Sequence, residues 1–463
     1  MPTLRDLQET IHGSLRLGAE VADDARGMTL GTVVTDSRKA GPGDLFWALV
    51  GPRHDGAEFA HEAFERGAAG AVVSRPVEPP GGRWVLRVDD TQQALEQWAG
   101  WTRRQFTGTV IGVTGSVGKS TSRQMIYTAL ASRLSGTASP RNFNNHIGLP
   151  LSLLQVRPEH DFAVLEMGAS RPGDIASLAS LCAPTIGVIT QIGEAHLGSF
   201  GSQRAIAAAK AELLAALPPD GHAVLGDDAW LRRVARDCKV PATWVGRTAD
   251  CDLAASDIRC GHGQLFFRLS DCEFSVPVWG RHHLTSALAA VAVGRLMGLE
   301  LDEIAAALKG FAALPMRCEV QEVRGATIIN DAYNANPTAM QAALELVRDF
   351  DAEGRRIIVC GDMAELGDDA ALLHARLGNQ VVTLCGADLL IACGQHARDV
   401  VAGARSAGMA PTHSIPCRTP DDALPFLGQA INPGDVVLVK GSRVLGMERL
   451  IEAMKQFPRR RIA

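Results

Sequence analysis

The sequence predicts an α/β protein with three domains, of which the second and third are built around parallel sheets. Its 463 residues are more than one ordinary hydrophobic core accommodates. Continuous apolar runs of four or five residues alternate with helical patterns along most of the chain, as expected for strands buried on both faces. Hydrophobic residues make up 46% and charged residues 21%, which is typical of a folded globular protein.

The first predicted domain covers residues 1–100. Short strand-like runs occur at residues 45–49 and 71–73, with a helical pattern between them at residues 56–67. The segment 76–82 is rich in proline and glycine, and we expect it to be a loop inside this domain.

The second predicted domain covers residues 101–313 and begins with an apolar strand at residues 109–113. Further strand-like runs follow at residues 162–165, 186–189 and 223–225, with helical patterns between them, for example at residues 206–217. This alternation predicts a parallel sheet covered on both faces. Shorter alternating runs at residues 252–278 favour a small antiparallel patch.

The third predicted domain covers residues 314–463. Its strand-like runs lie at residues 326–329, 356–360, 389–392 and 435–439, again separated by helical patterns. The same reasoning predicts a doubly wound, Rossmann-like unit.

Charge and cysteine usage exclude several classes of protein. The net charge of −5 provides no positive field to hold a nucleic acid polymer or an anionic membrane. The short basic run 459–461 is interpreted as a solvated end. No signal-peptide pattern and no apolar run of membrane-spanning length occurs, so we expect a cytoplasmic protein without stable membrane insertion. The ten cysteines form no C-x-x-C pair and are expected to be reduced and mostly buried.

The strongest local motif is GVTGSVGKST at residues 112–121, between a predicted strand and a predicted helix. Glycines let the backbone amides curl around a phosphate, and the helix N-terminus adds partial positive charge. Lys119 would reach the β- and γ-phosphates, and the Ser120 hydroxyl would bind Mg²⁺. The predicted nucleotide-binding residues are Gly115, Ser116, Gly118, Lys119, Ser120 and Thr121. Val113 replaces the first glycine of the strict pattern, and a glycine-rich turn with a solvated lysine is the alternative.

Such a loop occurs in kinases, motor ATPases and ligases, but its form TGSxGK[ST]T resembles the Mur ligases and their folate-linked relatives. Five further stretches resemble that family in the same order along the chain. They are RNFNNHIGLP at 141–150, EMGA at 166–169, GEAHL at 193–197, DAYNANP at 331–337 and GDMAELG at 361–367. TDSR at 35–38 and the stretch 434–443, which contains KGSR, agree as well, so the resemblance spans nearly the whole chain.

The resemblance implies an ATP-dependent amide ligase with a central P-loop ATPase domain. The last two stretches are most similar to the members that add D-alanyl-D-alanine to UDP-N-acetylmuramoyl-tripeptide through an acyl phosphate, in peptidoglycan precursor synthesis. The implied arrangement is a UDP-substrate domain, an ATP-binding domain and a C-terminal domain that binds the amine, in a monomer. Two alternatives are another Mur-type ligase, third-residue-adding or folylpolyglutamate-like, and a non-catalytic nucleotide-binding paralogue.

By resemblance, Ser120, Glu166 and His196 are ligands of Mg²⁺. Lys210 is similar to the family's carbamylated lysine, and the alternative is a surface lysine on an alanine-rich helix. Arg317 resembles an arginine that reaches the γ-phosphate, a role suited to a guanidinium. The implied catalytic residues are therefore Lys119, Lys210, His196 and Arg317.

The remaining implied contacts concern the nucleotide and the substrates. Asp331 resembles the residue that binds the ATP ribose, and His282 lies in a stretch that resembles the adenine-contacting pattern GxHNxxN. His283 and Ser286 replace the two asparagines of that pattern, so the adenine contacts of this chain differ from those of the family. The implied substrate-binding residues are Ser37, Arg38, Asn145, Asn334 and Asn336.

Overall fold

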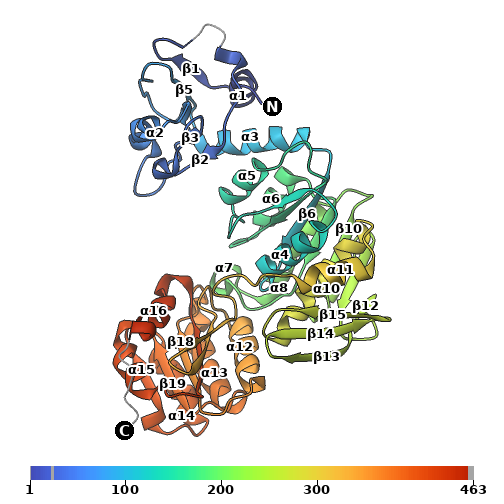
Figure 1. Cartoon of the computed structure of the whole chain (residues 1–463), viewed down its shortest axis with the longest axis vertical. Coiled ribbons are helices and arrows are strands. Elements are labelled where there is room, and N and C mark those ends of the chain that lie inside the picture. The colour runs from blue at the N-terminus through green and yellow to red at the C-terminus, as the bar shows by residue number, and fades with distance from the viewer. Residues whose placement is uncertain (1, 22–24, 457–463) are drawn as a thin grey trace. The chain divides into compact units, whose positions relative to one another are not determined.

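The computed structural model describes residues 2–21 and 25–456, which fall into two compact units (Figure 1). The first unit comprises residues 1–110, 135–167 and 177–183, and the second comprises residues 111–134, 168–176 and 184–463. Each unit contains sheets flanked by helices, and each is described separately below.

The first unit contains a five-stranded sheet in the order β1-β5-β4-β3-β2, in which only β1 is antiparallel to its neighbour. Its strands are β1 (Ser14–Leu17), β2 (Val33–Val34), β3 (Leu45–Trp47), β4 (Gly70–Val73) and β5 (Trp84–Arg87). Helices α1 (Leu4–Ile11) and α3 (Thr91–Gln105) contribute to the core on one face, and α2 (Ala60–Glu65) covers the other. The buried Trp47 indole also donates a hydrogen bond of 2.7 Å to the Thr91 carbonyl at the start of α3. The unit also contains the parallel pair β7 (Gly136–Ala138) and β8 (Phe162–Glu166), and helix α5 (Gly148–Leu153).

The second unit begins with parallel strands in the order β12-β11-β10-β9-β6. They are β6 (Thr109–Thr114), β9 (Ile186–Ile189), β10 (His222–Gly226), β11 (Ala242–Gly246) and β12 (Leu253–Ala254). An antiparallel sheet follows, made of β13 (Ser256–Gly261), β14 (Gln264–Leu269) and β15 (Cys272–Val276). The helices of this part are α4 (Lys119–Leu130), α7 (Leu197–Phe200), α8 (Gln203–Ala215), α9 (Ala229–Val234), α10 (Leu284–Leu296) and α11 (Leu301–Lys309), and α6 (Asp174–Cys182) is shared between the units.

The C-terminal part is a six-stranded sheet in the order β16-β17-β21-β18-β19-β20, with only β16 antiparallel. Its strands are β16 (Glu319–Val323), β17 (Ala326–Asn330), β18 (Arg356–Gly361), β19 (Leu389–Cys393), β20 (Ser414–Cys417) and β21 (Val436–Lys440). Helices α12 (Pro337–Asp349), α13 (Ala370–Thr383) and α14 (Ala397–Ser406) cover one face, and α15 (Leu424–Ala430) and α16 (Glu448–Gln456) cover the other (Figure 1).

The α/β class, the parallel sheets and the antiparallel patch are confirmed, with shifts at the ends of elements. The pattern at residues 56–67 divides into a short 3₁₀ turn and α2, because Asp55 caps the turn at Ala57. The helical pattern expected over residues 123–133 begins earlier, at Lys119, because Gly118 adopts a left-handed conformation directly before α4. Residues 253–254 form β12, which pairs with β11 in parallel instead of joining the antiparallel patch.

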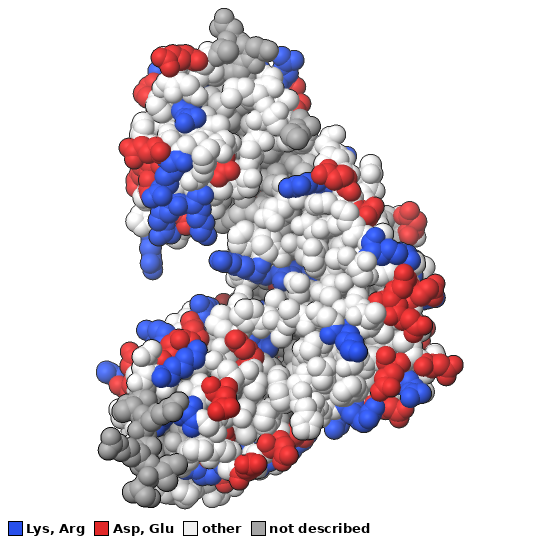
Figure 2. Space-filling model, in the orientation of Figure 1, with Lys and Arg blue, Asp and Glu red and all other residues white. Residues whose placement is uncertain are grey.

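Surface and cysteine features also agree with the sequence. All ten cysteines are free, and only Cys238, Cys260 and Cys272 are partly exposed. Acidic and basic side chains are interspersed on the face shown in Figure 2. Among residues 2–21 and 25–456, no helix has the length and apolar character needed to cross a membrane. The basic run 459–461 lies outside the described residues.

Two helices of the C-terminal part pack through glycine, which makes their contact testable. A Cβ atom on Gly378 of α13 would lie 1.8 Å from the Val400 carbonyl oxygen of α14. We therefore expect Gly378→Ala to lower the free energy of unfolding by about 1 to 3 kcal/mol, because the backbones must separate. Urea unfolding followed by circular dichroism measures this change.

Gly100 of α3 is the matched control. A Cβ atom there would have its nearest neighbour, a Leu181 methyl group, at an ordinary 3.5 Å. Gly100→Ala is expected to be neutral or to stabilise by up to about 1 kcal/mol, because alanine favours a helix. Equal unfolding midpoints for the Gly378 variant and the wild type would contradict the close packing of α13 and α14.

Candidate active site

The glycine-rich loop between β6 and α4 has the backbone conformation of a phosphate cradle. Gly115 has φ of 146° and Gly118 has φ of 82°, values that favour glycine. A Cβ atom on Gly115 would lie 2.0 Å from the Thr190 hydroxyl oxygen, so only glycine fits there. Thr190 follows β9 and donates a hydrogen bond of 2.5 Å to the Val117 carbonyl oxygen. Ser116 donates from its hydroxyl to the Gly193 carbonyl oxygen at 3.0 Å, so the loop is tied to the segment after β9.

Lys119, Ser120 and Arg317 lie together at this loop. The Lys119 ammonium group donates to the Gly115 carbonyl oxygen at 2.8 Å, which holds it over the loop. The buried Ser120 hydroxyl accepts a hydrogen bond of 2.9 Å from the Arg317 guanidinium. The guanidinium also lies over the Tyr333 ring, 4.1 Å from the ring centroid. Arg317 is therefore held by contacts on both sides, one of them at the first turn of the phosphate-loop helix.

Lys210 on α8 is a buried amine in a positively charged environment. Only 3% of the residue is exposed, and its nitrogen lies 5.8 Å from the Phe200 ring centroid. Burial, with repulsion from Lys119, lowers the pKa of Lys210 to about 7, although Glu212 and Asp174 act in the opposite direction. A large fraction of Lys210 is therefore a neutral amine at neutral pH. The interpretation of Lys210 as a surface lysine is wrong, because its helix face is buried.

His196 lies at the start of α7 with its imidazole directed at Glu365. Its Nδ1 atom is in close contact with the Glu365 carboxylate, and both residues have left-handed backbone conformations, with φ of 57° and 63°. Burial lowers the pKa of His196, and Lys119 and Lys210 contribute in the same direction, against the opposing effect of Glu365. The neutral imidazole is the form that binds metal ions. Strained backbone at both partners fits a functional site.

Cys318 and Asp331, which follow the second predicted domain, lie near His282 of that domain. Asp331 accepts from the Lys440 ammonium at 2.6 Å and from the Cys318 backbone amide at 3.2 Å. The His282 ring packs against the His283 ring, with centroids 4.1 Å apart. A small cavity of about 10 Å³ adjoins this segment. Its lining residues are Thr121, Val278, Trp279, His283, Phe311, Ala313, Leu314, Arg317 and Cys318, which connects α4 to the predicted adenine region.

Glu166 is at the end of β8 in the first unit and is 1% exposed. Its carboxylate accepts a hydrogen bond of 2.9 Å from the Asn144 amide, and its backbone amide donates to Ser139 at 3.1 Å. Neighbouring Asn145 uses its side-chain oxygen to accept from the Gly148 amide at 2.8 Å, where α5 begins. These bonds fix Glu166 at the carboxyl end of a parallel strand. Its role as a Mg²⁺ ligand together with Ser120 and His196 stays a prediction.

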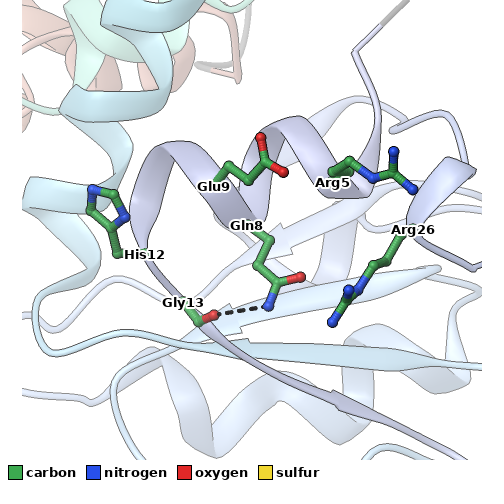
Figure 3. Close-up of a pocket in the computed structure, with 6 residues that line it drawn as sticks. All are labelled: Arg5, Gln8, Glu9, His12, Gly13 and Arg26. Carbon is green, nitrogen blue, oxygen red and sulfur yellow. Dashed lines mark hydrogen bonds between the residues drawn. The ribbon is translucent and has the colours of Figure 1, made fainter.

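The predicted substrate residues of the N-terminal sheet lie together in one short 3₁₀ helix, Ser37–Lys39. Buried Ser37 donates to Glu62 at 2.7 Å, whereas exposed Arg38 forms two bonds of 2.9 Å with Asp36. The Arg38 guanidinium lowers the pKa of Asp36 to about 2. A separate cavity of about 380 Å³ lies on α1 and contains none of the predicted residues (Figure 3). Its lining is Arg5, Gln8, Glu9, His12, Gly13 and Arg26.

Asn334 and Asn336 have structural contacts. The Asn336 side-chain oxygen caps α12 by accepting from the Ala339 amide at 2.8 Å, with Pro337 in the first turn. Asn334 accepts from the Ala335 amide at 2.9 Å, and its carbonyl accepts from Lys440 at 2.9 Å. Substrate binding by these two asparagines stays a prediction.

Glu365 and Lys440 contact predicted site residues, although sequence reasoning did not single them out. Both lie inside quoted stretches, GDMAELG and KGSR, so position in a motif was the signal available. Lys440 is 2% exposed, and its ion pair with Asp331 neutralises a charge that burial would penalise. A second pair, Arg376 with Glu194, joins α13 to the segment after β9.

Comparisons with known proteins agree with this geometry. Residues 113–294 match the family described as Mur ligase middle domain, and residues 316–443 match that described as Mur ligase, glutamate ligase domain. These ranges lie within the second and third predicted domains, whose exact boundaries stay predictions.

Relatives are similar over nearly the full chain. UDP-N-acetylmuramoyl-tripeptide–D-alanyl-D-alanine ligase of Bacillus subtilis is 35% identical over 92% of this chain and 93% of its own. The ligase of the same name from Escherichia coli is 33% identical over 98% of both chains.

Solved structures are similar as well. MurF from Acinetobacter baumannii has a TM-score of 0.86 at 30% identity, covering 98% of this chain and 99% of its own. MurF from Thermotoga maritima in complex with ADP has a TM-score of 0.78 at 30% identity, covering 92% and 97%. The predicted three-domain α/β architecture is thereby confirmed.

The lowered pKa of Lys210 predicts a pH-dependent stability. Between pH 7 and pH 10.5 the unfolded chain keeps a proton on this lysine that the folded chain has lost, so stability rises with pH. Below pH 7 both states are protonated, and the folded chain bears the full cost of the buried charge. In CO₂-free buffer, Lys210→Met should therefore stabilise most at pH 6, and wild type should regain about 4 kcal/mol by pH 10.

Thermal unfolding of both proteins at pH 6, 8 and 10 measures this difference. Lys309→Met, which changes an exposed lysine at the end of α11, is the control and should show no such trend. A difference between Lys210→Met and wild type that stays constant from pH 6 to pH 10 would show that Lys210 keeps an ordinary pKa.

Proposed function

The chain belongs to the Mur ligase family and is an ATP-dependent ligase, and on that premise we propose that it joins D-alanyl-D-alanine to UDP-N-acetylmuramoyl-tripeptide. This is the reaction for which its relatives from Bacillus subtilis and Escherichia coli are named. The observation that carries the proposal is the contact between the phosphate-loop residue Ser120 and Arg317, which joins the two parts of the chain that the reaction requires. The product would be a precursor of peptidoglycan.

The proposed chemistry begins with transfer of the ATP γ-phosphoryl group to the tripeptide carboxylate. The carboxylate oxygen attacks phosphorus, ADP leaves, and an acyl phosphate forms. The dipeptide amine then attacks the carbonyl carbon, loses a proton, and phosphate departs. Two anions must meet in the first step, so charge neutralisation and alignment are the protein's main tasks.

Lys119 and Arg317 are suited to neutralise that charge. Lys119 is held over the loop by its bond to Gly115, and Arg317 reaches the same loop through Ser120. A guanidinium binds phosphate oxygens in a fixed planar geometry, whereas the lysine acts as a point charge. We assign both to the phosphates of ATP, with Asp331 and His282 on the nucleoside side.

The donor set of Ser120, Glu166 and His196 fits Mg²⁺ with bound phosphates. A hydroxyl, a carboxylate fixed by Asn144 and a neutral imidazole supply oxygen and nitrogen ligands without excess charge. When bound, the ion would help to offset the negative charge of the phosphates. We propose these three residues as its protein ligands.

Lys210 is proposed to be carbamylated. Its neutral amine attacks the carbon of CO₂, an N–C bond forms, and the amine releases a proton to solvent, leaving a carbamate anion. The pKa of about 7, lowered by burial, supplies the neutral amine that this step needs. The resulting negative charge would be attracted by Lys119, which now repels the Lys210 ammonium.

We propose the cytoplasm as the location and a single chain as the working form. ATP and UDP-linked precursors are cytoplasmic metabolites. Ser37, Arg38 and Asn145 are proposed to bind the UDP-linked substrate. Asn334 and Asn336 are assigned to the dipeptide side.

The acceptor specificity is tested by phosphate release with UDP-N-acetylmuramoyl-tripeptide, ATP and Mg²⁺. Release should require D-alanyl-D-alanine and should remain at background with glutamate or with single amino acids. Lys119→Ala should lower kcat by at least about 100-fold, because a major neutralising charge is lost. Activity with glutamate or diaminopimelate in place of the dipeptide would assign the chain to another Mur-type reaction.

The carbamate is tested with Lys210→Ala. We expect at least about a tenfold loss of kcat and partial recovery when acetate or propionate is added, because a small carboxylate replaces the missing anion. Lys309→Ala, at an exposed position, is the control and should respond to neither change. Full activity of the plain Lys210→Ala protein would end this hypothesis.

A further inference from the structure

Three soft donor groups gather beside the predicted nucleotide site. His282 and His283 belong to the 3₁₀ helix Arg281–His283, and Cys318 lies immediately before β16. Their ligand atoms all lie within 4.8 Å of one another. The Cys318 sulfur is 3.7 Å from Nε2 of His282.

This spacing is close to that of a zinc site. With Zn–S of about 2.3 Å and Zn–N of about 2.0 Å, sulfur and nitrogen ligands in a tetrahedral site lie about 3.5 Å apart. The Cys318–His282 pair already has nearly that separation, and the remaining pairs need a contraction of at most about 1.5 Å. Imidazole and thiolate donors select zinc-class ions over Mg²⁺, which prefers oxygen.

The surroundings hold the donors in place. The Cys318 backbone amide donates to Asp331 at 3.2 Å, and the Gly280 amide before the two histidines donates to the Cys260 sulfur at 3.3 Å. Cys318 and His283 are buried, whereas His282 is exposed as a residue. Ligands supported in this way meet one requirement of a metal site.

We propose that His282, His283 and Cys318 form a binding site for a zinc-class divalent ion, with the fourth position open to solvent. The site is separate from the proposed Mg²⁺ ligands Ser120, Glu166 and His196. It depends on His283, which replaces an asparagine of the family's adenine pattern, and on a cysteine next to Arg317.

A bound ion would tie the turn at His282 and His283 to the segment that carries Arg317. Because Arg317 contacts Ser120, fixing this segment limits how the guanidinium reaches the phosphates. Zinc is therefore expected to slow the ligase reaction, a consequence that rests on the proposed function. Metal binding itself does not depend on that function, so the two can fail separately.

The test is titration of the full-length, untagged chain with Co²⁺, whose absorption reports both geometry and thiolate ligation. We expect one equivalent to bind with a thiolate-to-metal charge-transfer band, and one equivalent of Zn²⁺ to displace it. Cys318→Ser should abolish the band, and His283→Asn and His282→Asn should each weaken binding at least tenfold. Circular dichroism of each variant confirms that it is folded.

Cys238→Ser is the matched control, because this partly exposed cysteine lies outside the cluster and should leave the band intact. The site is overturned if wild type shows no thiolate band, or if Cys318→Ser and His283→Asn both bind Co²⁺ as wild type does. If Co²⁺ binds but Zn²⁺ does not change phosphate release, the metal site stands and the proposed effect of the bound ion on Arg317 is wrong.

Discussion

An excess of positive charge around the phosphate loop is the constraint on which the candidate site depends. Lys119 lies over the loop, the buried Lys210 is close enough for Lys119 to lower its pKa, and both lower the pKa of His196. The carboxylates of Glu212 and Asp174 act in the opposite direction at Lys210. Clustered positive charges destabilise the folded protein when no anion is bound, and an anionic ligand relieves this repulsion. A triphosphate is therefore a suitable ligand for the site.

Much of this arrangement was predictable from the sequence because it follows from local rules. A glycine-rich turn after an apolar strand specifies the loop whatever the rest of the chain does, since Gly115 and Gly118 need backbone angles that other residues avoid. Parallel strands could be recognised as continuous apolar runs, and the cap at Asn336 before Pro337 follows the usual start of a helix. Features that depend on neighbouring residues, such as the loop, the strands and the start of α12, were therefore predictable.

Contacts between residues that lie far apart in the sequence were not predictable. Glu365 and His196 lie in loops that follow strands of two different sheets. Both residues have a left-handed backbone conformation, which cannot be recognised from the sequence. Lys440 and Asp331 are 109 positions apart and meet because β17 and β21 are neighbours in the sheet. The burial of Lys210 likewise depends on which face of α8 packs inward, and the alanine-rich sequence of that helix has too little polar contrast to decide it.

The bond between Arg317 and Ser120 determines how the loop must change when a nucleotide binds. The Ser120 hydroxyl oxygen accepts a hydrogen bond from the Arg317 guanidinium and is also a proposed metal ligand. These two interactions compete for the same oxygen atom. Phosphate oxygens are stronger acceptors for a guanidinium than a neutral hydroxyl, because the hydrogen bond is then charged on both sides. An incoming triphosphate thus offers Arg317 a better partner and frees Ser120 at the same moment, so that ligand binding itself supplies the free energy for the exchange.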